Sequence, residues 1–260
     1  MSFFVKKAQE NAGPDFSAAH QQGTPSNLAL YEASAAGDLG AMQTAVRQGG
    51  NPNYMCRAAD GATSLHVAAR NRNSRTTLEF LVGVGGFVGA KLLGNYNNPL
   101  HEALACGNDE GAKILVEVGD ADVAAKNSFG NTPLFITVKL GNLTMSQYLI
   151  SKGHKIDIQN NRGSTTLHLC ASLCKETVVA QVPPAAAVGG ENLPPPPNDA
   201  NNNAAVPPAV EKLGGGGGQN EEDEIFVILA AQLIKNGINL NLQDENGYTA
   251  LHTAAARLVS

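Results

Sequence analysis

The sequence contains no tryptophan, and aromatic residues make up only 5% of its 260 residues. A chain of this length that folded around one large core would use more aromatic side chains, because these bury the largest apolar areas. A stack of small interfaces rich in alanine and leucine needs few of them. The scarcity of aromatics therefore favours a repeated architecture.

Long apolar runs and a cysteine framework are also missing. No run of 18 or more apolar residues exists, so we expect no transmembrane helix and no membrane insertion. The segment Phe3-Phe4-Val5 is too short for a signal-peptide core, and its positive charges follow it. The four cysteines, at positions 56, 106, 170 and 174, show no disulfide spacing. We therefore expect a cytoplasmic protein in a reducing compartment, with the cytoskeleton or a cilium as alternatives.

Positive charge is not in excess. The chain has 18 Lys and Arg residues against 23 Asp and Glu residues, which gives a formal net charge of −5. Proteins that bind nucleic acid usually carry a basic patch or stripe. We therefore expect no nucleic-acid partner.

One four-residue phrase recurs along the chain. Its copies are Thr63-Ser64-Leu65-His66, Asn98-Pro99-Leu100-His101, Thr132-Pro133-Leu134-Phe135, Thr165-Thr166-Leu167-His168 and Thr249-Ala250-Leu251-His252. The first four leucines are 33 to 35 residues apart, whereas the last gap is 84 residues. A fixed period near 33 indicates one supersecondary unit that is copied and stacked, and the long gap indicates an insertion.

The residues around the phrase recur as well. A glycine lies four residues before the leucine in four copies, and a small residue lies three residues after it in four copies: Gly61, Gly130, Gly163 and Gly247, and Ala68, Ala103, Cys170 and Ala254. This linked pattern resembles the ankyrin repeat. The resemblance implies an all-α solenoid of about five to six stacked helix-turn-helix units with hairpin fingers. It also implies that the repeated histidine bonds the turn of its own or the next repeat.

The period divides the chain into units. Residues 1–26 are expected to form a flexible tail, and 27–260 the repeat domain. The units are 27–58 (degenerate, with helices near Leu28–Ala36 and Leu39–Gln48), 59–92, 93–126, 127–160, 161–243 and the half unit 244–260. In the half unit we expect an apolar flank, including Leu251 and Ala255, to face solvent.

Several positions depart from the family pattern. Phe135 replaces the repeated histidine, and Tyr96 stands where glycine is expected. Arg72 and Cys174 occupy the glycine position after the first helix. The tract Gly83–Gly89 is unusually rich in glycine and replaces a regular helix end and finger. The departures from the family pattern therefore concentrate in the second repeat, its finger and the first helix of the fourth repeat.

A Pro-, Gly- and Asn-rich insertion interrupts the fifth unit. We expect residues from about 176 to 222 to form a disordered loop, because this composition buries too little apolar surface to offset its ordering entropy. An inert insertion is one interpretation; a ligand for a proline-binding domain, anchored on Leu193 and Pro194–Pro197, is the other. After the loop, Glu221–Glu224 lead into Ile225–Ile234, which we interpret as the displaced second helix.

No catalytic constellation is apparent. His168, Cys170 and Cys174 lie close on one predicted helix, which could supply metal ligands. However, Cys170 falls at the small core position and His168 at the repeated histidine position, so structural roles are favoured. The glycine-rich tracts lack the Lys-Ser/Thr ending of a phosphate loop. We therefore predict no enzyme activity, no metal and no cofactor.

The resemblance implies binding of other proteins through the concave first-helix face and the hairpin tips. The expected contact residues are Arg70, Tyr96, Glu102, Ser128, Phe129, Ile136, Lys139, Leu140, Arg162, Ser172, Leu173, Glu245 and Arg257. The predicted function is a non-catalytic adaptor or scaffold for a protein partner that the sequence does not identify. The alternatives are a structural component of a large cytoskeletal or ciliary assembly and a regulatory or targeting subunit of an enzyme complex.

Overall fold

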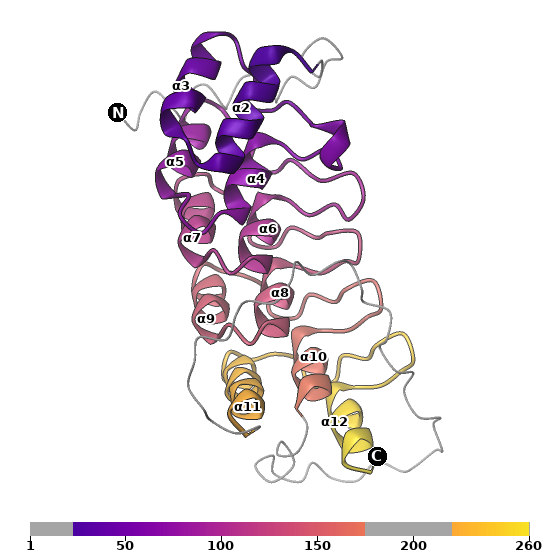
Figure 1. Cartoon of the computed structure of the whole chain (residues 1–260). Coiled ribbons are helices and arrows are strands. Elements are labelled where there is room, and N and C mark those ends of the chain that lie inside the picture. Colours follow the sequence, from indigo (N-terminus) through magenta and orange to yellow (C-terminus); the bar gives the residue numbers. More distant parts are fainter. Residues whose placement is uncertain (1–22, 175–219, 260) are drawn as a thin grey trace. The chain divides into compact units, whose positions relative to one another are not determined.

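The computed structural model describes residues 23–174 and 220–259, and it divides the chain into two compact units, Met1–Ser128 and Phe129–Ser260. Regular secondary structure in these described ranges is helical, apart from two isolated β-bridges, Cys56–Ala62 and Gln243–Thr249 (Figure 1). The expected all-α fold is therefore confirmed. None of the helices in the described ranges is long and apolar enough to cross a membrane. The expected tail lies mostly outside these ranges.

The first unit contains three helix pairs. They are α2 (Pro25–Ala36) with α3 (Leu39–Arg47), α4 (Ser64–Arg70) with α5 (Arg75–Gly83), and α6 (Pro99–Ala105) with α7 (Asp109–Glu117). The first helices α2, α4 and α6 pack in one row, and α5 and α7 pack in a second row. A short 3-10 turn, Arg57–Ala59, lies in the hairpin before α4. One pair falls in each of the predicted units 27–58, 59–92 and 93–126, except that α2 begins at Pro25, inside the expected tail 1–26.

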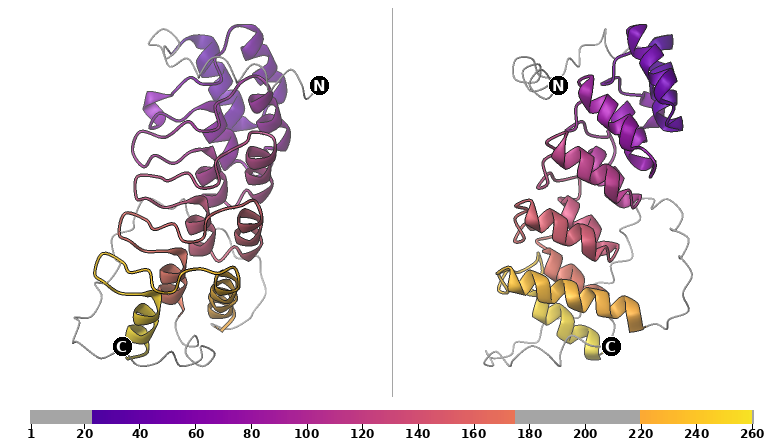
Figure 2. Two further views of the ribbon diagram at one scale, coloured as in Figure 1. Left: turned by 180° about the vertical axis from the view of Figure 1, so that it is seen from behind. Right: turned by 90° about the vertical axis from the view of Figure 1, so that its left-hand side faces the viewer.

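The second unit repeats this arrangement. Its helices are α8 (Pro133–Lys139), α9 (Leu143–Ser151), α10 (Thr166–Leu173), α11 (Asn220–Lys235) and α12 (Ala250–Val259). The first helix α10 packs against both α8 and α12, while α11 packs against α10 and α9 (Figure 2). Helices far apart in the sequence, α10 and α11, thus form one helix pair.

The repeated phrase starts every first helix after α2. Asn98 is extended (φ −93°, ψ 172°), and its side chain accepts a hydrogen bond from the His101 N–H at 3.0 Å. Pro99 follows in the first turn, where its missing N–H is not needed. The leucine of the phrase then points into the stack, since Leu65, Leu100 and Leu134 are 0% exposed. The phrase therefore encodes a cap and a core contact together.

In the half unit the leucine has a different environment. Leu251 on α12 is 54% exposed, and Ala255 is also exposed. The prediction of a solvent-facing apolar flank is confirmed.

The turn that recurs before the first helices of the later repeats needs a left-handed residue. Gly61, Gly130 and Gly163 have φ values of 73°, 73° and 70°. Tyr96 occupies the equivalent turn with φ 55°, a conformation that costs a residue with a Cβ atom about 1–2 kcal/mol. The turn geometry is therefore kept in spite of the substitution, at a cost in stability.

The insertion differs from expectation at its end. Residues 175–219, including Leu193 and Pro194–Pro197, lie outside the described ranges. Helix α11 starts at Asn220, five residues before the expected Ile225, so Glu221–Glu224 lie in the helix and not ahead of it. Carboxylates in the first turns of a helix are favourable because they face its positive end. The disorder expected for 176–222 remains a prediction.

Candidate protein-interaction surface

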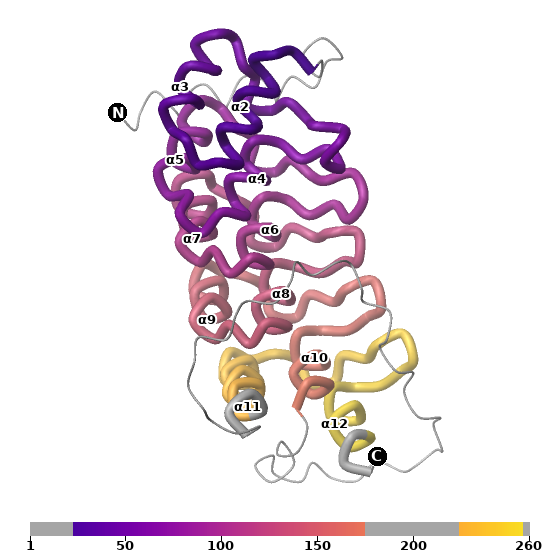
Figure 3. Tube along the Cα trace, viewed as in Figure 1, coloured from indigo at the N-terminus to yellow at the C-terminus, as the bar shows by residue number. Residues whose placement is uncertain are grey.

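Within each unit the hairpin fingers lie side by side (Figure 3), and backbone hydrogen bonds join neighbouring fingers near their tips. In the first unit, the N–H of Leu93 donates to the carbonyl of Asp60 (2.9 Å) and the N–H of Ser128 donates to that of Asn95 (2.9 Å). In the second unit, Asn161 donates to Phe129 (3.0 Å), and Glu245 to Arg162 (2.8 Å). The tips are thus held in a fixed register within each unit, which gives side chains there a defined spacing.

The predicted tip residues point mostly to solvent. Tyr96 is 51% exposed and Phe129 is 41% exposed. Arg162 and Glu245 are exposed, and Ser128 is half-buried. Four of the five predicted tip side chains are therefore accessible to a partner.

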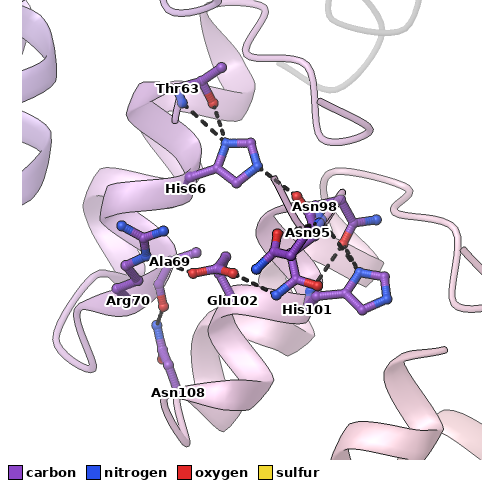
Figure 4. Close-up of polar contacts among 10 residues, drawn as sticks. Thr63, His66, Ala69, Arg70, Asn95, Asn98, His101, Glu102 and Asn108 are labelled. Atoms are coloured by element: carbon purple, nitrogen blue, oxygen red, sulfur yellow. Dashed lines mark hydrogen bonds and ion pairs between the residues drawn. The ribbon is translucent and has the colours of Figure 1, made fainter. Parts of the chain in front are cut away.

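The repeated histidine joins successive repeats in both units. The Nδ1 atom of His66 accepts from the Thr63 N–H (3.2 Å) and lies 2.9 Å from Thr63 Oγ1, while Nε2 donates to the carbonyl of Asn97 in the next finger (3.1 Å) (Figure 4). In the second unit, Nε2 of His168 lies 3.0 Å from the carbonyl of Tyr248. The prediction that this histidine bonds its own or the next turn is confirmed.

Burial changes the pKa of His66. Removal from water lowers the pKa of His66 to about 4, and the hydrogen bond to Asn97 offsets this only in part. The neutral ring is therefore the form that the folded chain holds at neutral pH. A buried neutral histidine bonded at both nitrogens serves as a connector, not as a general base.

Arg70 and Glu102, both predicted to contact a partner, form an ion pair with each other. Arg70 Nε lies 2.7 Å from Glu102 Oε2, and Asn97 Nδ2 donates to Glu102 Oε1 at 2.8 Å (Figure 4). Glu102 is 8% exposed, whereas the Arg70 side chain is 39% exposed. The carboxylate is thus enclosed by internal donors, and only the guanidinium presents itself at the surface.

Asn108 forms buried hydrogen bonds that the repeat pattern of the sequence does not predict. Its side chain is 2% exposed, and Nδ2 lies 2.9 Å from the carbonyls of Ala69 and Asn71 and 3.0 Å from Ser74 Oγ. Its Oδ1 accepts from the Gly111 N–H at 2.8 Å and caps α7. An asparagine directly after the turn glycine at 107, and directly before a helix, was the available signal.

The first helices of the second unit carry an apolar strip. Ile136 and Leu140 are four residues apart at the end of α8; Ile136 is half-buried and Leu140 is 46% exposed. On the adjacent α10, Leu169 and Leu173 have the same spacing, and both are half-buried. Residues four apart share one helix face. We define these four side chains as the first-helix strip.

The remaining predicted contact residues lie around this strip. Lys139 is exposed and Ser172 is half-buried, and each belongs to one of the same two helices. Arg257 lies on α12, but its side chain is outside the described part of the structure. The structure thus places an apolar strip on the first helices with polar groups beside it.

The cysteines of α10 are core residues. Cys170 is 0% exposed, and burial raises the pKa of its thiol strongly. Both ring nitrogens of His168 are engaged in hydrogen bonds. Among the described side chains, no group of three or more His, Cys, Asp or Glu residues is placed to hold a metal ion.

Comparison with known proteins identifies the repeats. The family model described as "Ankyrin repeats (3 copies)" matches residues 30–127 and 118–181, which is more than half of the chain. It does not reach α11 and α12, where the structure continues the same pairing of helices. Ankyrin repeats are generally protein-interaction modules.

Curated relatives match over shorter stretches. The transient receptor potential cation channel subfamily A member 1 homolog of Caenorhabditis elegans is 39% identical over 83 residues, 32% of this chain and 7% of the relative. The human SH3 and multiple ankyrin repeat domains protein 2 is 32% identical over 116 residues, 44% of this chain and 6% of the relative. Human protein phosphatase 1 regulatory subunit 27 is 39% identical over 79 residues, 30% of this chain and 51% of the relative. The matches therefore span between 6% and about half of these relatives.

Proposed function

Because the chain belongs to the ankyrin-repeat family, we propose that it is a non-catalytic adaptor or scaffold whose second unit binds a partner protein through the first-helix strip and the adjacent tips. The observation that carries this is the exposure of two large apolar side chains in the second unit: Phe129, 41% exposed at a tip, and Leu140, 46% exposed at the end of α8. Large apolar side chains on an otherwise polar surface often mark a contact. Ile136 and Leu173 extend this surface at half burial.

The surroundings of the strip suit a protein interface. Binding energy concentrates in a few large side chains near the centre, and a polar rim excludes water. Here the aliphatic strip is the centre, and Lys139, Arg162, Ser172 and Glu245 are rim groups. We therefore expect the partner to present one or two aliphatic or aromatic anchors with charged residues beside them.

The first unit contributes a smaller part in this proposal. Tyr96 and Arg70 are its accessible predicted contacts, while Glu102 acts by holding Arg70 in place. Ser128 contributes its backbone to the finger register. The cytoplasmic location, with the cytoskeleton or a cilium as alternatives, and membership of a large assembly stay predictions.

The test is a double substitution in the second unit. Phe129→Ala with Ile136→Ser should weaken partner capture by more than about 2 kcal/mol, because two central apolar groups are removed. Leu240→Ala is the matched control, since Leu240 is 47% exposed and lies outside the proposed surface. Circular dichroism checks that helix content is retained. Equal recovery of the same partners by the double variant and the control would refute the assignment.

A second candidate is a regulatory or targeting subunit of an enzyme complex. The match to protein phosphatase 1 regulatory subunit 27, over about half of that protein, favours it. The direct test mixes the purified chain with the catalytic subunit of protein phosphatase 1 and measures co-elution and the dephosphorylation rate. Separate elution with an unchanged rate would exclude this enzyme as the partner.

A further inference from the structure

Helix α11 differs from the other second helices in its outer face. At the positions of α7 and α9 that match Ile228 and Ala231 in the repeat, the side chains are polar: Glu110 and Lys113 on α7, and Thr144 and Gln147 on α9. At the position that matches Ile234, α7 and α9 carry Val116 and Ile150, which are half-buried. On α11, Ile228 and Ile234 are 39% and 43% exposed, with Ala231 exposed between them. The opposite face is buried, as expected for a second helix: Leu229, Ala230 and Leu233 are 1%, 6% and 1% exposed. A helix that is apolar on both faces normally has a partner on each of them.

Charges at the two ends of this outer face have opposite signs. Glu224, Ile228, Ala231 and Lys235 follow one another at spacings of four, three and four residues, and all four are exposed. This spacing keeps them on one line along the helix, as in a coiled-coil seam. Along this line the side chains are therefore, in order, negatively charged (Glu224), apolar (Ile228), small (Ala231) and positively charged (Lys235). α11 is the long orange helix in the right-hand view of Figure 2, where α9 and α11 of the second unit face the viewer.

We propose that this outer face is a homodimer interface in which α11 packs antiparallel on α11 of a second copy. A line with a negative start and a positive end complements itself only in the antiparallel orientation. Glu224 then faces Lys235 of the second copy, at both ends, and Ile228 faces Ala231 of the second copy. A parallel pair would place Glu224 of one copy beside Glu224 of the other and Lys235 beside Lys235, and like charges that close repel.

This surface is distinct from the proposed partner surface, because it lies on a second helix and not on the first helices and tips. One helix pair covers less area than a standard interface of about 1,600 Å². We therefore expect a weak, concentration-dependent dimer with a Kd of about 10–100 µM. A dimeric adaptor would present two copies of its partner surface.

The test is sedimentation of the full chain across this concentration range, with charge reversals. Glu224→Lys alone and Lys235→Glu alone should each raise the Kd at least tenfold, because each places like charges at both ends of the interface. The two single variants, mixed in equal amounts, should dimerise with each other, and the double variant should regain the wild-type Kd. Glu32→Lys and Lys155→Glu, at exposed positions elsewhere, are the matched controls for charge and should leave the Kd unchanged.

Three results would overturn the proposal. The first is a wild-type chain that stays monomeric at several hundred micromolar, which would indicate that another protein covers this face. The second is a dimer whose Kd is the same in the wild type, in Glu224→Lys and in Lys235→Glu. The third is a pair of single variants that fail to associate on mixing although each keeps wild-type helix content by circular dichroism.

Discussion

Arg70, the last residue of α4, forms an ion pair with Glu102 of α6 at 2.7 Å, so two successive repeats are joined through these side chains. The pair is asymmetric, because the carboxylate side chain is 11% exposed and the guanidinium side chain is 39% exposed. Removal of the arginine leaves a buried charge with only Asn97 to compensate it.

Replacing either member of this pair alone should destabilise the first unit. Arg70→Met is expected to cost about 1–3 kcal/mol of unfolding free energy, since an unpaired buried carboxylate keeps its desolvation penalty. The double variant Arg70→Met with Glu102→Met should recover most of that loss. Urea unfolding of the three variants forms a double-mutant cycle, and additive losses would show that the two side chains do not interact.

Low pH should lower the free energy of unfolding, because the pKa of His66 is lower in the folded chain than in the unfolded chain. Its pKa is about 4 in the folded chain and about 6.5 when unfolded. Between these values the unfolded chain binds a proton that the folded chain does not, so stability is complete above pH 6.5 and falls as the pH drops toward 4. The full loss is about 3 kcal/mol.

The variant that isolates this effect is His66→Phe. Phe135 occupies the equivalent position in the second unit and is 6% exposed, which shows that a phenyl ring fits there. The variant should be less stable at pH 7, because it loses the hydrogen bonds to Thr63 and Asn97. Its stability should nevertheless change less between pH 7 and pH 4.5, as measured by chemical denaturation. Parallel pH profiles for the variant and the wild type would contradict the assignment.

Tyr96→Gly should stabilise the chain. Tyr96 has φ 55° in a turn where the equivalent residues are glycines, and relief of this strain is expected to add about 0.5–1 kcal/mol. If Tyr96 also contacts the partner, the same variant will bind more weakly while it melts at a higher temperature. A lower melting temperature would show that the tyrosine ring contributes more to folding than its backbone conformation costs.

Asn108→Ala should be among the more damaging single changes in the first unit. It removes the cap on α7 and leaves the carbonyls of Ala69 and Asn71 without their donor, with an expected loss of about 2–4 kcal/mol. Asn108→Asp keeps the cap acceptor but places a charge against those carbonyls, so it should be no better than alanine. An aspartate variant with wild-type stability would show that the cap is the main contribution.

The stacking of repeats was predictable because it depends on positions that recur. Leu65, Leu100 and Leu134 were identified by their period, and all three are completely buried. The left-handed turn at Tyr96 was also predictable, because glycine occupies the equivalent position in the other full repeats.

The contacts between repeats were harder to predict. The period does not mark Arg70 and Glu102 as a pair, since they occupy different positions in their repeats and meet only after stacking. Both were therefore expected to face a partner. The sequence predicts a start of α11 at Ile225, which is five residues too late. A run of four acidic residues resembles a solvated loop end, but the field of a helix N-terminus favours the same residues.

The hydrogen bond between His168 and Tyr248 has a consequence for the order in which the second unit assembles. These two residues are 80 positions apart in the sequence, whereas the equivalent pair His66 and Asn97 is 31 apart. Closing the longer segment costs about 0.8 kcal/mol more in chain entropy. Contacts that enclose longer segments also form more slowly. We therefore expect α8, α9 and α10 to become protected from hydrogen exchange before α11 and α12 dock on them during refolding.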